Sequence, residues 1–201
     1  MAHPLDRPVL LAIDGRSGSG KTSLAAALQR ALAAQHHLDV EVFHVEDTYR
    51  GWEGLQAGVD HYVQAVLPPL HRGETATWHA WDWAAGRVET TQRVARPASV
   101  VICEGVGAAC KQALPMLDAA LTLDVPADHR KQRALARDGE TYRPYWDVWA
   151  AQEDDFLRDQ ETVPEPARGL DLTLAPPTTA DLAATYQAAE TWALQVITST
   201  L

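Results

Sequence analysis

The sequence predicts a three-layer α/β domain, with a parallel five-stranded sheet flanked by helices. Three observations predict this class: short apolar runs recur along the chain, amphipathic stretches separate most of them, and a glycine-rich turn follows the first run. Short apolar runs are typical of strands that are buried on both faces of a parallel sheet. We expect the strands at residues 9–13, 40–45, 100–103, 119–125 and 170–174.

The amphipathic stretches are predicted to form the helices that cover the sheet. In the first of them, Leu24, Leu28 and Leu32 recur at the spacing of one helical face. The proline pair at 68–69 should end the second helix, because proline lacks the backbone N–H. The expected helices are 22–35, 59–70, 128–137, 142–157 and 179–199.

Length and composition limit the classes of protein that this chain fits. Its 201 residues fit a single domain over 1–201, with a small helical lid at about 127–160. The net charge of −10 disfavours nucleic acid and membrane surfaces as partners, because both are negatively charged. No run reaches the ~20 apolar residues that span a bilayer. Residues 1–7 show no secretory pattern, and Cys103 and Cys110 are expected to be reduced. The predicted location is therefore cytoplasmic. A homo-oligomer is possible on this sequence and is not predicted further.

Residues 15–22 read Gly-Arg-Ser-Gly-Ser-Gly-Lys-Thr, a full match to the G-x-x-x-x-G-K-[ST] pattern of a phosphate-binding loop, or P-loop. Glycines let successive backbone N–H groups point inward at phosphate oxygens, and the following helix adds the positive end of its dipole. Lys21 is expected to reach the terminal phosphates, and the Thr22 hydroxyl to ligate Mg²⁺. The pattern therefore predicts a P-loop NTPase fold that binds ATP and Mg²⁺. The predicted nucleotide-binding residues are Gly15, Arg16, Ser17, Gly18, Ser19, Gly20, Lys21, Thr22 and Ser23.

The choice among P-loop proteins narrows by elimination. The chain contains no asparagine, so it cannot carry the N-K-x-D motif with which Ras-type GTPases recognise guanine. An LSGGQ signature is absent, and 201 residues are too few for a large ATPase machine. What remains is mainly a small kinase that moves the γ-phosphoryl group to a small-molecule acceptor.

Acidic residues follow two of the predicted strands. Glu46 and Asp47 come after the second strand, and Glu104 follows the third. The carboxyl ends of parallel strands line the ligand crevice of such a sheet. One acid can therefore hold Mg²⁺ while another accepts the proton of an attacking hydroxyl. The alternative for each is a solvated loop carboxylate.

Three arginines, Arg130, Arg133 and Arg137, are spaced to lie on one face of a predicted helix. Such a cluster is typical of sites that bind a phosphoryl group during its transfer, because guanidinium groups neutralise the charge on phosphate oxygens. The alternative is a solvated basic face. The acidic run at 153–155 is interpreted as a solvated helix face.

Taken together, these segments resemble the uridine kinase and phosphoribulokinase superfamily of P-loop kinases. The resemblance covers about residues 9–175, and only the P-loop is highly specific by itself. The matching segments are 13–22, 45–49, 100–105, 123–126 and the arginine helix up to Asp138.

The resemblance implies a role for each matched residue. Asp47 would activate the substrate hydroxyl, and Thr22 and Glu104, with Asp47 beside them, would hold Mg²⁺. The implied catalytic residues are Asp47, Lys21, Arg133 and Arg137, and the implied substrate-site residues are Tyr49, Asp60, Trp81, Arg130 and Arg143.

One stretch departs from that superfamily. Uridine kinases carry a tyrosine-rich strand and a histidine that reads the pyrimidine edge, whereas residues 78–83 here read Trp-His-Ala-Trp-Asp-Trp, and His79 does not fall at the base-reading position. A base could stack on Trp81 or Trp83, or the tryptophans could serve packing alone. The sequence thus predicts an ATP-dependent phosphotransferase that acts on an alcohol hydroxyl, with a nucleoside as the first candidate acceptor. Two alternatives stay open: a kinase for a non-nucleoside acceptor, and a regulatory nucleotide-binding protein without turnover.

Overall fold

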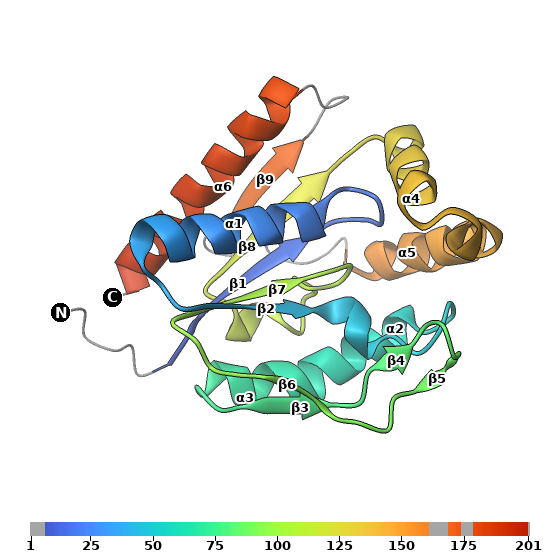
Figure 1. Cartoon of the computed structure of the whole chain (residues 1–201), viewed down its shortest axis with the longest axis horizontal. Coiled ribbons are helices and arrows are strands. Elements are labelled where there is room, and N and C mark those ends of the chain that lie inside the picture. The colour runs from blue at the N-terminus through green and yellow to red at the C-terminus, as the bar shows by residue number, and fades with distance from the viewer. Residues whose placement is uncertain (1–6, 161–168, 174–178, 201) are drawn as a thin grey trace.

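The structure is a computed structural model that describes residues 7–160, 169–173 and 179–200 (Figure 1). It confirms the predicted α/β architecture. At its centre lies a parallel sheet with the strand order β2-β7-β1-β8-β9, and each strand begins and ends within one residue of its predicted bounds. The strands are β1 (Val9–Asp14), β2 (Val40–His44), β7 (Val100–Glu104), β8 (Ala119–Asp124) and β9 (Gly169–Thr173).

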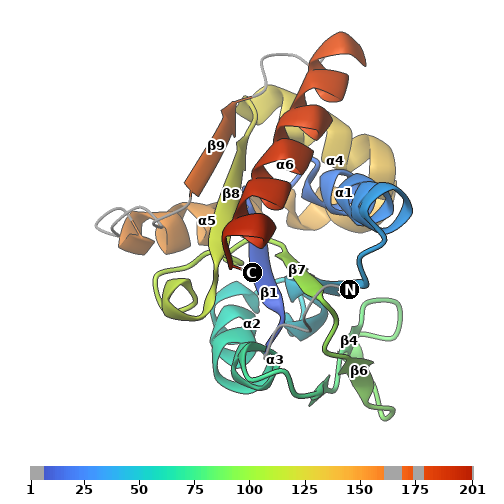
Figure 2. The ribbon, with the colours of Figure 1, turned by 90° about the vertical axis from the view of Figure 1, so that its left-hand side faces the viewer.

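Alternate residues of the central strand β1 enter two hydrophobic cores, one on each face of the sheet, because successive side chains of a strand point to opposite faces. Leu10 packs in the core that contains Tyr62 and Phe156. Leu11 packs in the core that contains Leu28 and Trp192. The second core is covered by α1 and α6, which lie together on one side of the sheet (Figures 1 and 2). These two helices are α1 (Lys21–His36) and α6 (Thr179–Thr200).

The helical run on the other face differs from the prediction in both its start and its end. It begins at Leu55, contains one wide π-helical turn, and continues past the proline pair to His71. The predicted stop at 68–69 is wrong because the prolines occupy the first turn of α3, where the missing N–H would lack an intrahelical partner in any case. The run comprises α2 (Leu55–His61), the π turn (Tyr62–Val66) and α3 (Leu67–His71).

Two small antiparallel ribbons, which the sequence did not predict, follow this helical run. Strands of two or three residues are too short to leave a periodic pattern. Trp78, in the first ribbon, is buried with its ring edge-on to Phe43, 4.9 Å between ring centroids, so this tryptophan serves packing. The ribbons pair β3 (Ala76–Trp78) with β6 (Arg93–Ala95), and β4 (Trp81–Asp82) with β5 (Arg87–Val88).

The segment 127–160, called the lid segment below, consists of two helices joined by a short 3₁₀ turn. The first helix is broken at Gly139, whose backbone adopts φ +54° and ψ −130°. The lid segment comprises α4 (Ala127–Tyr142), the turn (Arg143–Tyr145) and α5 (Trp146–Gln160).

In the described part of the chain, no helix is both long enough and apolar enough to cross a membrane.

Candidate active site

The P-loop joins the end of β1 to the start of α1, and glycine is required by a positive φ at two positions and, at Gly18, also by a close backbone contact. At Gly18, with φ +81°, a Cβ atom would lie 2.2 Å from the carbonyl oxygen of Arg130. At Gly20, with φ +104°, it would lie 2.7 Å from the guanidinium group of Arg133. Only glycine combines this positive φ with the absence of a side chain. The loop is therefore folded tightly against α4.

The loop ends in groups that are suited to bind an anion. No side chain caps the N-terminus of α1 at Gly20, and the first N–H groups of a helix have no intrahelical partner. The buried Lys21 begins this helix, and its Nζ atom donates to the carbonyl oxygen of Arg16 at 3.2 Å. A phosphate group at this position would meet both the helix N-terminus and an ammonium group.

A buried carboxylate lies beside the loop at the end of β7. Glu104 accepts a hydrogen bond from the Thr22 hydroxyl at 3.0 Å, and its Oε1 atom lies 2.5 Å from Nδ1 of His44. This hydrogen bond raises the pKa of His44, against the opposing effect of burial. Three neighbouring elements, β2, β7 and α1, thus bring these three side chains together.

The oxygen atoms of Thr22 and Glu104 fit Mg²⁺, which prefers oxygen ligands in octahedral geometry. In the described ranges, no group of three or more His, Cys, Asp or Glu side chains forms a metal cage. In a nucleotide site, one or two protein groups and the phosphates share the coordination of Mg²⁺.

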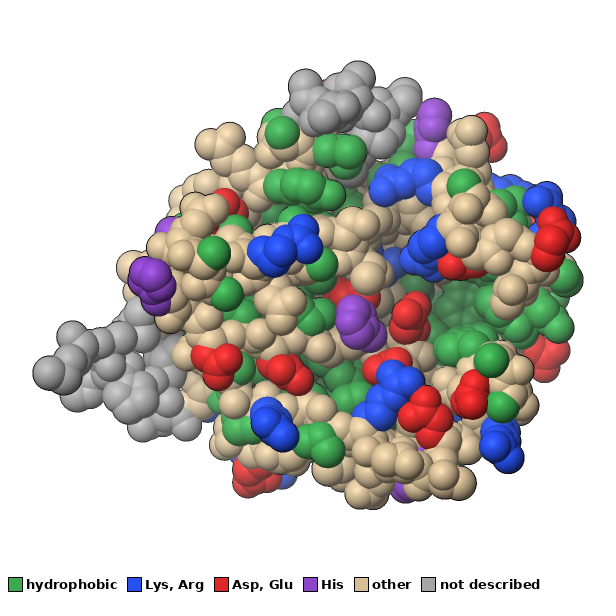
Figure 3. Space-filling model, viewed as in Figure 1, with side chains coloured by type: hydrophobic (Ala, Val, Ile, Leu, Met, Phe, Trp, Pro, Cys, Tyr) green, Lys and Arg blue, Asp and Glu red, His purple; other side chains and the backbone are tan. Residues whose placement is uncertain are grey.

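A cavity of about 650 Å³ opens in front of the P-loop. Lys21, Arg133 and Arg137 contribute positive charge to it, while Glu46 and Glu104 contribute negative charge. Figure 3 shows basic side chains above a recess on this face, acidic ones below it and hydrophobic ones beside it. The cavity therefore brings cationic and anionic side chains together beside an apolar surface. The apolar part, called the aromatic wall below, is formed by Tyr49, Trp52, Trp83, Tyr142 and Trp149.

The two acids that follow β2 point in different directions. Glu46 lines the cavity, and desolvation, followed by the nearby charge of Glu104, raises its pKa; desolvation raises the pKa of Asp47 as well. Asp47 is absent from the cavity lining and instead forms an ion pair with Arg93 at 2.8 Å. Both acids belong to the 3₁₀ turn Val45–Thr48, in which successive side chains are rotated by about 120°. The acid that faces the cavity is therefore Glu46.

The three arginines of α4 also divide by role. Arg133 lines the cavity and donates from Nη1 to the carbonyl oxygen of Ser19 at 3.2 Å. Arg137 lines it as well, paired with Asp138. Arg130 is buried behind the loop, where its guanidinium group donates to the carbonyl oxygens of Val125 and Ser17. Only two of the three are therefore placed to meet a ligand in the cavity.

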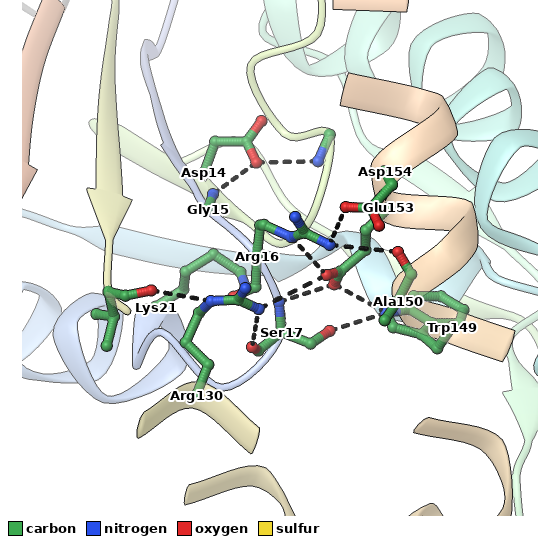
Figure 4. Close-up of polar contacts among 12 residues, drawn as sticks. Asp14, Gly15, Arg16, Ser17, Lys21, Arg130, Trp149, Ala150, Glu153 and Asp154 are labelled. Atoms are coloured by element: carbon green, nitrogen blue, oxygen red, sulfur yellow. Dashed lines mark hydrogen bonds and ion pairs between the residues drawn. The ribbon is translucent and has the colours of Figure 1, made fainter. Parts of the chain in front are cut away.

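The acidic run in α5 contains one residue that contradicts the expected solvated face. Glu153 is completely buried, whereas its neighbours Asp154 and Asp155 are exposed. Its carboxylate accepts hydrogen bonds from the backbone N–H of Ser17 and from Nε of Arg16 (Figure 4). Arg16, which the motif predicts to bind nucleotide, thus points towards α5 and also contacts Asp154 at 2.6 Å.

The aromatic wall is held together by ring contacts centred on Trp52. This indole stacks on Tyr142 at 5.0 Å and on Tyr145 at 4.7 Å, measured between ring centroids, and contacts Trp83 at 4.8 Å. Tyr49, as the resemblance implied, lines the cavity, and its hydroxyl donates to the carbonyl oxygen of Val106. The contacts join the segment before α2 to the lid segment.

No protein-family model matches the chain. Among similar solved structures, a possible uridine kinase from Bacillus stearothermophilus is 23% identical, with a TM-score of 0.57 over 82% of this chain and 89% of that chain. A putative fructose transport system kinase from Silicibacter is 23% identical, with a TM-score of 0.59 over 85% and 90% of the two chains. A D-glycerate 3-kinase from Cryptococcus neoformans is 13% identical, with a TM-score of 0.56 over 84% and 86%. This chain has a P-loop kinase-like fold.

Within the P-loop kinase-like fold, four residues that were predicted for the substrate site lie away from the cavity lining: Arg130, described above, and the three that follow. Trp81 lies in β4, and its neighbour Trp83 lines the cavity instead. Asp60 is exposed and accepts a hydrogen bond from Gln56. Arg143 is exposed beside Glu140. The predicted loop residue Ser23 does line the cavity.

No role was predicted for Trp52, Tyr142 or Trp149, and Glu153 was predicted to lie on a solvated helix face. For two of them a signal was present. Trp149, Glu153 and Phe156 are spaced at i, i+4 and i+7, which is the pattern of one buried helix face. No sequence pattern indicates that Trp52 contacts the lid segment.

Proposed function

We propose that this protein is an ATP- and Mg²⁺-dependent kinase that transfers the γ-phosphoryl group to a hydroxyl of a small molecule. The observation that carries the proposal is the single cavity in which the P-loop, the cations of α4, the acids after β2 and β7, and the aromatic wall all meet. A P-loop by itself supports nucleotide binding only. A cavity beside the P-loop that can hold an acceptor molecule supports phosphoryl transfer as well.

The residues divide the proposed reaction among them. Lys21, Arg133 and Arg137 would neutralise the charge on the transferred phosphoryl group. Thr22 and Glu104 would hold Mg²⁺, which when bound offsets the phosphate charge. These assignments keep the roles that the motif and the resemblance implied.

For the proton acceptor we propose Glu46 in place of Asp47. Glu46 lines the cavity, whereas the Asp47 carboxylate is directed at Arg93. Desolvation raises the pKa of both acids, so the choice of Glu46 rests on its place in the cavity lining.

The cavity supports an acceptor that carries a planar ring and no phosphate group. The cationic lining residues are Lys21, Arg133 and Arg137, and the other charged lining residues are the carboxylates of Glu46, Glu104 and Asp138. A phosphorylated acceptor would need a further cation, and among the nearby arginines Arg93 is already paired with Asp47 and Glu89. Aromatic rings stack favourably on indoles. A nucleoside fits this description and is our first candidate.

The second candidate function is a nucleotide-binding regulatory protein without turnover. It is favoured by the self-stacking of the aromatic wall, because Trp52 already contacts Tyr142, Tyr145 and Trp83 in place of a ligand.

The test is ADP release from Mg-ATP in the presence of nucleosides, sugar alcohols and phosphorylated sugars, with Glu46→Gln and Asp47→Asn as a matched pair. We expect one unphosphorylated acceptor to stimulate release. Glu46→Gln should lower turnover by about 10²-fold, since it removes a general base. Asp47→Asn should lower it only a few-fold, since it loses a partly exposed ion pair.

The opposite order of the two variants would return the role to Asp47. Binding of ATP without stimulation by any acceptor would favour the regulatory protein. Absence of ATP binding to the wild-type chain would overturn both functions.

A further inference from the structure

We propose that Glu153 of the lid segment is a positioning residue for the P-loop. Its carboxylate fixes the first half of the loop in the shape that receives phosphate. The inference rests on the proposed nucleotide site but not on catalytic turnover.

The contacts of Glu153 are all with the loop or with a residue that touches it. Its Oε1 atom accepts from the backbone N–H of Ser17 at 2.8 Å and from Nε1 of Trp149 at 3.0 Å. Its Oε2 atom accepts from Nε of Arg16 at 3.1 Å. The Trp149 indole also donates to the Ser17 hydroxyl at 2.8 Å. Backbone and side chain of Ser17 are therefore both held by α5 (Figure 4).

Burial makes these contacts strong. The Glu153 side chain is 1% exposed, and a second guanidinium group, that of Arg130, lies 3.9 Å from it. A buried carboxylate is costly unless cations and hydrogen-bond donors surround it, and here two guanidinium groups, an indole and a backbone N–H do so. Removing the charge would leave Arg16 and Arg130 without their buried counter-charge.

The loop is held from α4 as well as from α5. Arg130 donates to the carbonyl oxygen of Ser17, and Arg133 donates to that of Ser19. These bonds occupy carbonyl oxygens, whereas Glu153 occupies an N–H group. Glu153 thus fixes the direction of the Ser17 N–H group, while the N–H group of Ser19 donates to the carbonyl oxygen of Arg16 within the loop.

The test compares Glu153→Gln with Asp155→Asn, a matched loss of one charge on the same helix. Asp155 is 75% exposed and pairs with Arg158 three residues along. We would measure the Kd of Mg-ATP by calorimetry, the inhibition constant of adenosine as a competitor, and the Tm of each variant. All binding is measured well below the lowest Tm.

We expect Glu153→Gln to weaken Mg-ATP binding by at least about tenfold, which is the loss of charged hydrogen bonds to the loop. Adenosine binding should change less than about twofold, because adenosine has no phosphate to sense the loop. Asp155→Asn should leave both constants unchanged.

Two results would overturn the inference. In one, Glu153→Gln lowers the Tm but leaves the Kd of Mg-ATP unchanged. In the other, it weakens ATP and adenosine equally, as a general structural role would. If the wild-type chain failed to bind Mg-ATP, the proposed function would fail instead, so the two failures are distinguishable.

Discussion

The P-loop and the aromatic wall face each other across one cavity and are built in opposite ways. The P-loop is short, local in sequence and held by backbone contacts, such as the carbonyl oxygen of Arg130 against Gly18. The aromatic wall gathers side chains from distant segments, and Trp52 joins them through ring contacts. The difference indicates that phosphate binding tolerates little change at the P-loop, whereas the acceptor site can be altered one ring at a time.

The largest effect should come from removing the cation of the P-loop. Lys21→Ala should lower turnover by about 10³-fold, because an ammonium group that stabilises developing charge in a buried site is lost. Lys111→Ala is the control, since Lys111 is exposed and donates to the carbonyl oxygen of Asp159. Steady-state ADP release measures both. Equal activity of the two variants would mean that the P-loop does not act on the transferred group.

Alanine substitutions at two glycines should show that the P-loop tolerates less change than the ribbons beside the aromatic wall. Gly18→Ala should weaken Mg-ATP binding by more than about tenfold, because its Cβ would lie 2.2 Å from a backbone carbonyl oxygen. Gly86→Ala, at φ +62° with nothing within 4 Å, should cost only about 1 kcal/mol of stability and leave ATP binding intact. Calorimetry and thermal unfolding give the two numbers. Normal ATP affinity in Gly18→Ala would contradict a tightly constrained loop.

Rings of the aromatic wall that do not contact the P-loop should affect the acceptor alone; Trp149, which donates to the Ser17 hydroxyl, is not one of them. Trp83→Ala should raise the KM of the acceptor by about tenfold through loss of stacking area, with the Kd of ATP unchanged. Trp81→Ala should change this KM much less, because Trp81 lies outside the cavity lining. If Trp81→Ala had the larger effect, the ring predicted from the sequence would be the right one.

The smallest effect concerns Gln152, which precedes Glu153 and contacts the other side of the cavity. Its amide Nε2 donates to the carbonyl oxygen of Trp52 at 2.6 Å, and its Oε1 accepts from the N–H of Leu55. Gln152→Ala should raise the acceptor KM by a few-fold and lower stability by about 1 kcal/mol. ATP affinity should not change. If Gln152→Ala lost as much ATP affinity as Glu153→Gln, the contacts of α5 with the P-loop and with the acceptor side would not be independent.

The sequence was sufficient to predict the strands of the sheet, because each apolar run is flanked by turn residues and lies next to an amphipathic stretch. It was sufficient for the P-loop, because eight consecutive residues carry the whole pattern. It could not decide between Glu46 and Asp47, since a 3₁₀ turn sends adjacent side chains in different directions. Which acid faces the cavity depends on Arg93, more than forty residues away in the sequence.

The aromatic wall was beyond sequence reasoning for a related reason. Trp52 contacts Trp83, which comes from a ribbon further along the chain, and Tyr145, which comes from the lid segment. Nothing in their spacing indicates this contact. The burial of Glu153, by contrast, was readable from its helical spacing with Trp149 and Phe156, although composition suggested a solvated face.

The stacking of Trp52 on Tyr142 and Tyr145 affects how fast the lid segment can move. For the lid segment to move away from the segment before α2, these ring pairs must separate. Each pair contributes about 0.5–1.5 kcal/mol beyond its buried area, so separation slows opening without preventing it. Segments of this kind move in microseconds to milliseconds, and their opening often limits turnover through product release. In the proposed kinase, replacing one of these rings should therefore shorten the time that a product stays bound.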